Sequence, residues 1–356
     1  AGPVLPGRAV QGGGGAMAAV PVREAGGKAR AGGELRGVAG ALAFLPERLK
    51  PLFQLLPEDV LTGLLEIRLR VGRPLAVTVR GRGQLFVGRG GALAVPDAAE
   101  TFAPADAGEF LERISRSSVY ALEEEFRHGY ITLPGGHRVG LCGETALEGG
   151  RPRTLRHVGS FNLRIAREVP GAAERIVPHI ARGPGRPRHT LVISPPGGGK
   201  TTVLRDIARR LGARLPVCVV DERSEIAACV RGVPQLDVGP CTDVVDGCPK
   251  AAGVMQALRT MSPRVIVTDE IGGPEDAAAL FEAAHAGVAV IASAHGAGWE
   301  DVVRRPGLQA LLNPCLFELL AVLGGPDQPG TVKAVTAPPS PRGGGHIPAA
   351  ASVHIR

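Results

Sequence analysis

Residues 189–202 read His-Thr-Leu-Val-Ile-Ser-Pro-Pro-Gly-Gly-Gly-Lys-Thr-Thr, and the rest of the fold can be worked out from this segment. An apolar run ends at Ile193, a glycine-rich turn follows, and the residues after Lys200 have the apolar spacing of one helix stripe. Glycines let backbone N–H groups converge on phosphate oxygens, and the positive end of a helix dipole adds to this. The segment therefore predicts a phosphate-binding loop between a strand and a helix.

The predicted nucleotide contacts fall on consecutive residues: Pro195, Pro196, Gly197, Gly198, Gly199, Lys200, Thr201 and Thr202. We expect Lys200 to reach the β- and γ-phosphates and to take part in catalysis, and Thr201 to bind Mg²⁺. Ser194 stands where the usual pattern GxxxxGK[ST] has its first glycine. A serine there is expected to be more strained than glycine.

Three other apolar segments end in polar residues that suit phosphoryl transfer. Val265–Thr268 is followed by Asp269, a predicted Mg²⁺ ligand, and by Glu270, which would polarise the attacking water. Glu222 follows another strand and is a second candidate for that role. His295 follows a fourth, either sensing the γ-phosphate or making structural hydrogen bonds. Because the carboxyl ends of parallel strands converge, we expect these groups to meet beside the phosphate loop.

The chain divides into regions that differ in composition and in the pattern of their apolar residues, and together these regions predict an α/β fold. We expect a disordered Gly/Ala/Pro-rich tail over 1–36, a smaller α+β domain over 37–180, a P-loop ATPase domain over 181–337 and a second disordered tail over 338–356. Continuous apolar strands in the ATPase domain predict a RecA/AAA-like parallel sheet with helices on both faces.

The α+β domain shows shorter patterns. Residues 42–65 are expected to be helical, and strands are predicted at 66–71, 75–79, 84–87 and 160–165 with a hairpin over 130–142. Arg138 and Arg164 lie on these strands. They are candidates for completing a catalytic site across a domain or subunit boundary, against an alternative role as solvated surface arginines.

Composition narrows the remaining choices. The net charge is +7, and lysine occurs at only a few positions. Because no dense basic run is present, the charge of the chain does not indicate a particular binding partner. Six cysteines form no CxxC pair, which gives no sign of a zinc site or a disulfide framework. No apolar run approaches the roughly 20 residues that span a bilayer.

In this order, the motifs resemble those of the secretion-type ATPases of type II, type IV pilus and type IV systems. The resemblance is closer still to the stage III sporulation protein AA family of endospore-forming bacteria. It covers about residues 40 to 335 and rests on six segments: Glu66–Pro74, Gly136–Leu141, Ser194–Thr202, Val220–Ile226, Met261–Glu270 and Ser293–Gly296.

The resemblance implies more than the residues do. In such ATPases an acidic segment and a histidine segment supplement the two Walker motifs, and Asp221-Glu222 and His295 stand in those places. The phosphate loop itself indicates ATP and Mg²⁺ as ligands. The resemblance implies a homo-hexameric ring in which arginines of the N-terminal domain reach a neighbour's nucleotide, and membrane-embedded sporulation channel proteins as partners. It also implies a cytoplasmic place at the membrane facing the forespore, on the mother-cell side.

Two other functions stay open. A nucleotide-gated scaffold would bind ATP with little turnover, but a water-polarising Glu270 favours hydrolysis. A nucleic-acid motor would use the same core, although nucleic acid is an unexpected partner with aromatic residues at 3%. The sequence contains neither the base-reading Asn/Thr-Lys-x-Asp of GTPases nor the Leu-Ser-Gly-Gly signature of ABC-type ATPases.

Overall fold

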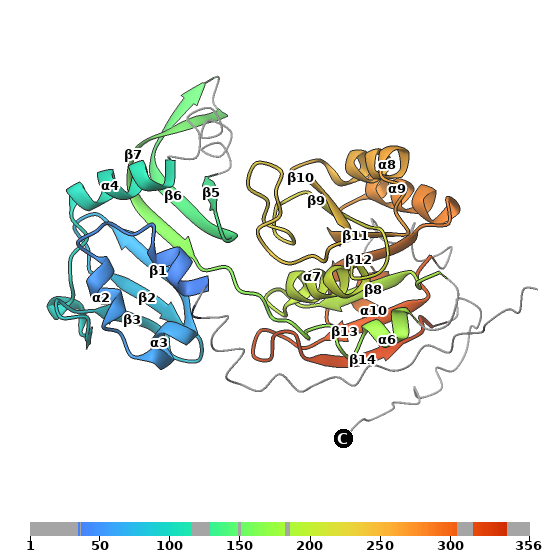
Figure 1. Cartoon of the computed structure of the whole chain (residues 1–356), viewed down its shortest axis with the longest axis horizontal. Helices are drawn as coiled ribbons and strands as arrows, with labels where there is room; N and C mark the ends of the chain where they lie inside the picture. Colours follow the sequence, from blue (N-terminus) through green and yellow to red (C-terminus); the bar gives the residue numbers. More distant parts are fainter. Residues whose placement is uncertain are drawn as a thin grey trace, which may run out of the picture.

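A computed structural model describes residues 35, 37–115, 129–148, 151–181, 186–304 and 316–339. Figure 1 shows one sheet in the N-terminal half, blue to green, and a second in the C-terminal half, joined by the chain that leaves β7. The two expected tails lie almost entirely outside the described residues.

The first sheet is antiparallel throughout, with strand order β4-β3-β2-β1-β7-β6-β5. Its strands are β1 (Leu64–Arg70), β2 (Ala76–Val79), β3 (Gly83–Val87), β4 (Leu93–Ala94), β5 (Tyr130–Leu133), β6 (His137–Glu148) and β7 (Arg151–Arg164). With it lie α2 (Lys50–Gln54), α3 (Glu58–Gly63), the 3-10 turn η1 (Pro96–Ala98) and α4 (Pro104–Ser115). The predicted strands and the 130–142 hairpin are confirmed.

Residues 42–65 do not form one continuous helix. Pro57 has an extended ψ of 145° and precedes α3, and Leu64 already belongs to β1. Proline has no backbone N–H and cannot donate the hydrogen bond that would continue a preceding helix. The segment therefore contains two short helices, α2 and α3. They cover a core in which the rings of Phe110 and Phe161 meet edge to face at 5.1 Å.

The second sheet has the order β10-β9-β11-β12-β8-β13-β14, and only β14 is antiparallel to its neighbour. Its strands are β8 (Thr190–Ser194), β9 (Val217–Asp221), β10 (Thr242–Asp246), β11 (Val265–Glu270), β12 (Ala289–His295), β13 (Leu319–Leu323) and β14 (Val332–Thr336). The strand β12 separates β8, which leads into the phosphate loop, from β11, which carries the acidic pair.

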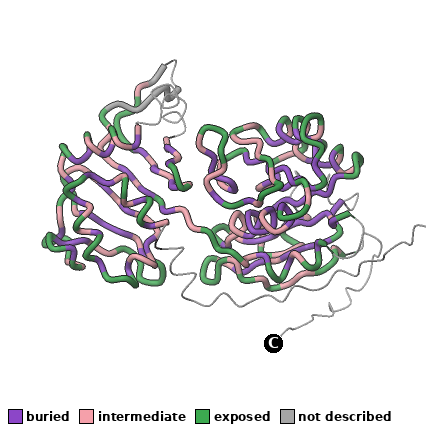
Figure 2. Tube along the Cα trace, in the orientation of Figure 1, coloured by how far each residue is buried: buried purple, intermediate pink, exposed green. Residues whose placement is uncertain are grey.

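Helices cover both faces of this sheet, as Figure 1 also shows. One apolar core contains α6 (Val177–Ile180) and α7 (Lys200–Leu211), and the other contains α8 (Lys250–Thr260), α9 (Pro274–His285) and α10 (Trp299–Val303). Neighbouring residues of a strand, such as Val219 and Val220, belong to opposite cores. The central strands are therefore buried except at the carboxyl ends of β11 and β12, as Figure 2 also shows, and the predicted α/β fold class is confirmed.

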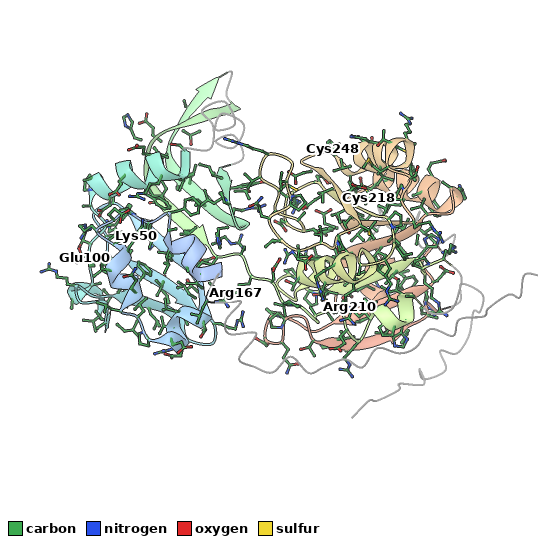
Figure 3. All side chains as sticks on the ribbon, viewed as in Figure 1. Lys50, Glu100, Arg167, Arg210, Cys218 and Cys248 are labelled. Atoms are coloured by element: carbon green, nitrogen blue, oxygen red, sulfur yellow. The ribbon has the colours of Figure 1, made fainter. Side chains whose placement is uncertain are left out.

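The two sheets touch through a few polar contacts. The N–H of Gly135, in the β5–β6 turn, donates to Gln235 Oε1 at 3.1 Å. Arg167, labelled at the junction in Figure 3, donates to Leu64 O at 2.7 Å, while its own carbonyl accepts a hydrogen bond from Arg205. No helix of the described residues is long and apolar enough to cross a bilayer.

Candidate active site

The phosphate loop lies at the carboxyl end of a central strand. β8 is fully buried between β12 and β13, and α7 begins at Lys200 directly after the loop. Gly197 and Gly199 have φ angles of 73° and 91°, in the left-handed region that favours glycine. The expected strand, loop and helix are therefore present, and the positive end of the helix dipole lies directly after the loop, where it suits an anion.

A second glycine-rich turn, residues 324–330 between β13 and β14, packs against the phosphate loop. Gly330 N donates to Gly198 O at 2.9 Å. A Cβ on Gly198 would overlap the carbonyl oxygen of Gly324, and one on Gly199 would come within 2.7 Å of Gly330 N. The 324–330 turn thus supports the loop from outside the motif, and the sequence analysis missed it.

Ser194 fits its place without the strain expected of it. It is the last residue of β8, is fully buried, and is not among the residues with positive φ. Its Oγ donates to Pro195 O at 2.8 Å. A glycine is unnecessary here because the backbone is still extended at this position.

Three predicted catalytic side chains form a connected row. Lys200 Nζ lies 2.7 Å from His295 Nδ1 and donates to Ser194 O at 3.3 Å. His295 Nε2 lies 3.0 Å from Glu270 Oε2. Since an ammonium can only donate, Nδ1 accepts from Lys200, and the proton on Nε2 faces Glu270. His295 therefore links the phosphate-binding lysine to the predicted water-polarising carboxylate.

The acidic side chains of two strand ends gather around a lysine that the sequence analysis did not single out. Lys250 Nζ lies 2.7 Å from Asp269 Oδ1 and 3.5 Å from Glu222 Oε2. It lies 3.9 Å from Asp276 Oδ2 and donates to the backbone carbonyl of Glu270. Burial raises the pKa of Asp269, and the charge of Lys250 acts against that rise. The only sequence signal for Lys250 was the scarcity of lysine in an arginine-rich chain.

The residues present fit a Mg²⁺ ion that would arrive with nucleotide. Asp269 Oδ1 is buried and, among the described residues, has no partner at a hydrogen-bonding angle despite the nearby Lys250. Such an oxygen suits a hard cation. The described residues contain no group of three or more His, Cys, Asp and Glu side chains placed to hold a metal by themselves. Thr201, water and phosphate oxygens would have to supply the other ligands.

The loop after β9 is organised by Asp221. Its carboxylate accepts hydrogen bonds from the backbone N–H groups of Glu225, Ile226 and Ala227 at 2.8–2.9 Å. Burial raises its pKa to about 6, against the effect of these donors. Asp221 thus shapes the acidic segment, and Glu222, which is exposed, is the residue of that segment that reaches the Lys250 group.

Arg138 and Arg164 lie on paired positions of β6 and β7 and line a cavity of about 250 Å³ between the two sheets, with Thr201 and Arg205 on its other side. Arg138 donates to Arg223 O at 2.6 Å, pairs with Glu225 at 3.3 Å and stacks on Tyr130. Arg164 is 62% exposed and lies 3.6 Å from Glu66. One chain therefore brings both arginines to a cavity that its own phosphate-loop threonine also lines.

Comparison with known proteins gives consistent matches. The family model described as sporulation stage III, protein AA matches residues 46–339. Stage III sporulation protein AA of Bacillus subtilis (strain 168) is 43% identical over 297 residues, covering 82% of this chain and 92% of that protein. The Arabidopsis thaliana protein SEEDLING PLASTID DEVELOPMENT 1 is 36% identical over 166 residues, covering 46% of this chain and 23% of that protein.

Among solved structures, the ATPase DotB of Legionella pneumophila aligns with a TM-score of 0.50 at 18% identity, over 78% of this chain and 77% of DotB. At that identity the likeness shows the fold, which is the RecA-like P-loop fold expected from the sequence.

Proposed function

Because this chain belongs to the sporulation stage III protein AA family, we propose that it is an ATPase that hydrolyses ATP with Mg²⁺ and energises a sporulation channel complex. The observation that carries the proposal is the row Lys200–His295–Glu270 beside the glycine-rich loop. A protein that only bound nucleotide would not need a carboxylate linked through a histidine to its phosphate-binding lysine.

The roles follow from the chemistry of each group. Lys200 and the backbone N–H groups of the loop after Pro196 would hold the phosphates, and Thr201 and Asp269 would hold Mg²⁺, which would supply positive charge to the phosphate oxygens. Glu270 accepts a proton from the attacking water. His295 keeps Glu270 in position and loses its contact with Lys200 when that ammonium turns to a γ-phosphate.

The assembly is part of the proposal. We infer a homo-hexamer, because the resemblance of the motifs to those of secretion-type ATPases implies such a ring. Its partners would be membrane-embedded sporulation channel proteins, with the ring on the cytoplasmic, mother-cell side. Division of the chain near residue 180 into an α+β domain and an ATPase domain would let the two sheets move against each other during turnover.

The first experiment measures steady-state Mg²⁺-ATPase activity against protein concentration, with particle mass followed by light scattering. Lys200→Ala is the test variant, and Lys333→Ala, which removes an exposed lysine on β14, is its control. We expect wild type and the control to gain specific activity as assembly proceeds, and Lys200→Ala to have none. An ATP-binding monomer without turnover would instead identify a nucleotide-gated scaffold.

A further inference from the structure

Lys250 is a buried cation in a place where the proposed mechanism has no role for it. Only 2% of its side chain is exposed, and it opens α8 directly after Pro249. Removing an ammonium from water is unfavourable unless partners compensate it. Its partners come from three elements: Glu222 after β9, Asp269 in β11 and Asp276 in α9.

The charges around Lys250 do not balance. Three carboxylates lie within 3.9 Å of one ammonium. Glu222 is exposed and Asp276 half-buried, so water screens part of this excess, but Asp269 is only 14% exposed. The ammonium of Lys250 keeps the group together, and the charge of Arg223 also acts on Asp269. Without Lys250, the negative charge that remains would attract a divalent ion.

We propose that Lys250 is a positioning residue that holds Asp269 and Glu222 in place while the site contains no nucleotide, and so prevents a divalent ion from binding there alone. The proposal rests on the proposed function, because it gives Asp269 the role of metal ligand. A divalent ion would then enter with the nucleotide, whose phosphates add the ligands and negative charge that overcome repulsion by Lys250. The consequence is that the site does not fill with free Mg²⁺.

The test uses the full chain without nucleotide and Mn²⁺ as the probe, since carboxylates and water bind Mg²⁺ and Mn²⁺ alike. Binding is followed by loss of the free Mn²⁺ signal in electron paramagnetic resonance. Lys250→Met, which keeps the side-chain length without the charge, should bind Mn²⁺ at least about ten-fold more tightly than wild type. Lys250→Arg keeps the charge and should bind as weakly as wild type.

A folded Lys250→Met with wild-type Mn²⁺ affinity would overturn the proposal, because a purely structural lysine predicts that result. If Lys250→Met does not fold in metal-free buffer, its circular dichroism is followed during Mn²⁺ addition. Recovery with Mn²⁺ but not with NaCl of equal ionic strength supports the proposal, and no recovery with either contradicts it.

The double variant Lys250→Met with Asp269→Asn locates the effect. It should lose the added Mn²⁺ affinity, and retention of that affinity would place the ion elsewhere and contradict the proposal. The ATPase proposal fails on a different measurement: the wild-type protein would then neither bind nor hydrolyse ATP. That result does not depend on the outcome of the Mn²⁺ titration.

Discussion

At the scale of single residues, Glu270 is placed to act in hydrolysis, and other groups of the site are placed to bind nucleotide. Its carboxylate faces the proton of His295, whereas Lys200 and the loop amides face the place for phosphate. Glu270→Gln keeps the size and a hydrogen-bonding oxygen but removes the basic group. We expect ATP to stay bound and turnover to fall by roughly 100-fold, the lower range for a general base. Nucleotide affinity and single-turnover hydrolysis measure the two effects separately.

Glu275→Gln is the matched control for this variant, because Glu275 is an exposed carboxylate at the start of α9. It should leave both affinity and turnover unchanged. Wild-type turnover in Glu270→Gln would assign the water-polarising role to another group, and Glu222 would be the first to examine.

Single residues also show where sequence reasoning ended. Lys200, Glu270 and His295 were predicted because each stands at the end of an apolar strand or the start of a helix, and parallel strands bring such ends together. Lys250 also begins a helix, α8, but no apolar strand or glycine-rich loop precedes it in the sequence. It lies about twenty residues before Asp269 in sequence, and only the packing of α8 against the sheet carries its ammonium to that carboxylate.

At the scale of elements, the phosphate loop depends on the 324–330 turn. Gly198 has no positive φ, so alanine is conformationally allowed there, but its Cβ would overlap Gly324 O and Ser194 Oγ. We expect Gly198→Ala to lower the free energy of unfolding by about 1–3 kcal/mol, as overpacked positions do. ATP affinity should fall as well, since the loop must shift away from its phosphate-binding shape.

Gly325→Ala is the control for this substitution, because a Cβ on Gly325 meets nothing within 4 Å. Urea unfolding and nucleotide titration of both variants test the prediction. Equal stability and affinity in the two variants would show that the 324–330 turn moves aside freely and does not support the loop.

The elements that sequence patterns missed have a common physical reason. β10 is a short edge strand with Thr242, Asp243 and Asp246 among its five residues, so it has no apolar run. β13 is buried, but its sequence Leu-Leu-Ala-Val-Leu fits a helix as well as a strand. β14 is half-exposed and pairs only with β13. By contrast, β8, β9, β11 and β12 combine apolar runs with polar ends, and those strands were predicted.

At the scale of the whole molecule, the cavity between the sheets decides how Arg138 acts. Its guanidinium contacts Arg223 O and Glu225 of its own chain, in a cavity that the same chain's Thr201 lines. We therefore expect Arg138 to serve the nucleotide of its own subunit. Arg138→Ala should keep nucleotide affinity and lose at least about ten-fold in turnover, less than a full arginine finger supplies. Arg82→Ala, a turn arginine paired with Asp59, is the control and should keep full activity.

Mixing the Arg138→Ala and Lys200→Ala variants distinguishes the two arrangements. Arg138→Ala retains an intact phosphate loop, and Lys200→Ala retains an intact Arg138. If Arg138 works within its own subunit, no subunit of a mixed assembly has both groups at one nucleotide, and the mixture shows no activity above the sum of the separate variants. If Arg138 reaches a neighbour's nucleotide, as the resemblance to secretion ATPases implied, some interfaces in the mixture become complete. Activity above the sum of the separate variants would then overturn the assignment that the contacts with Arg223 and Glu225 support.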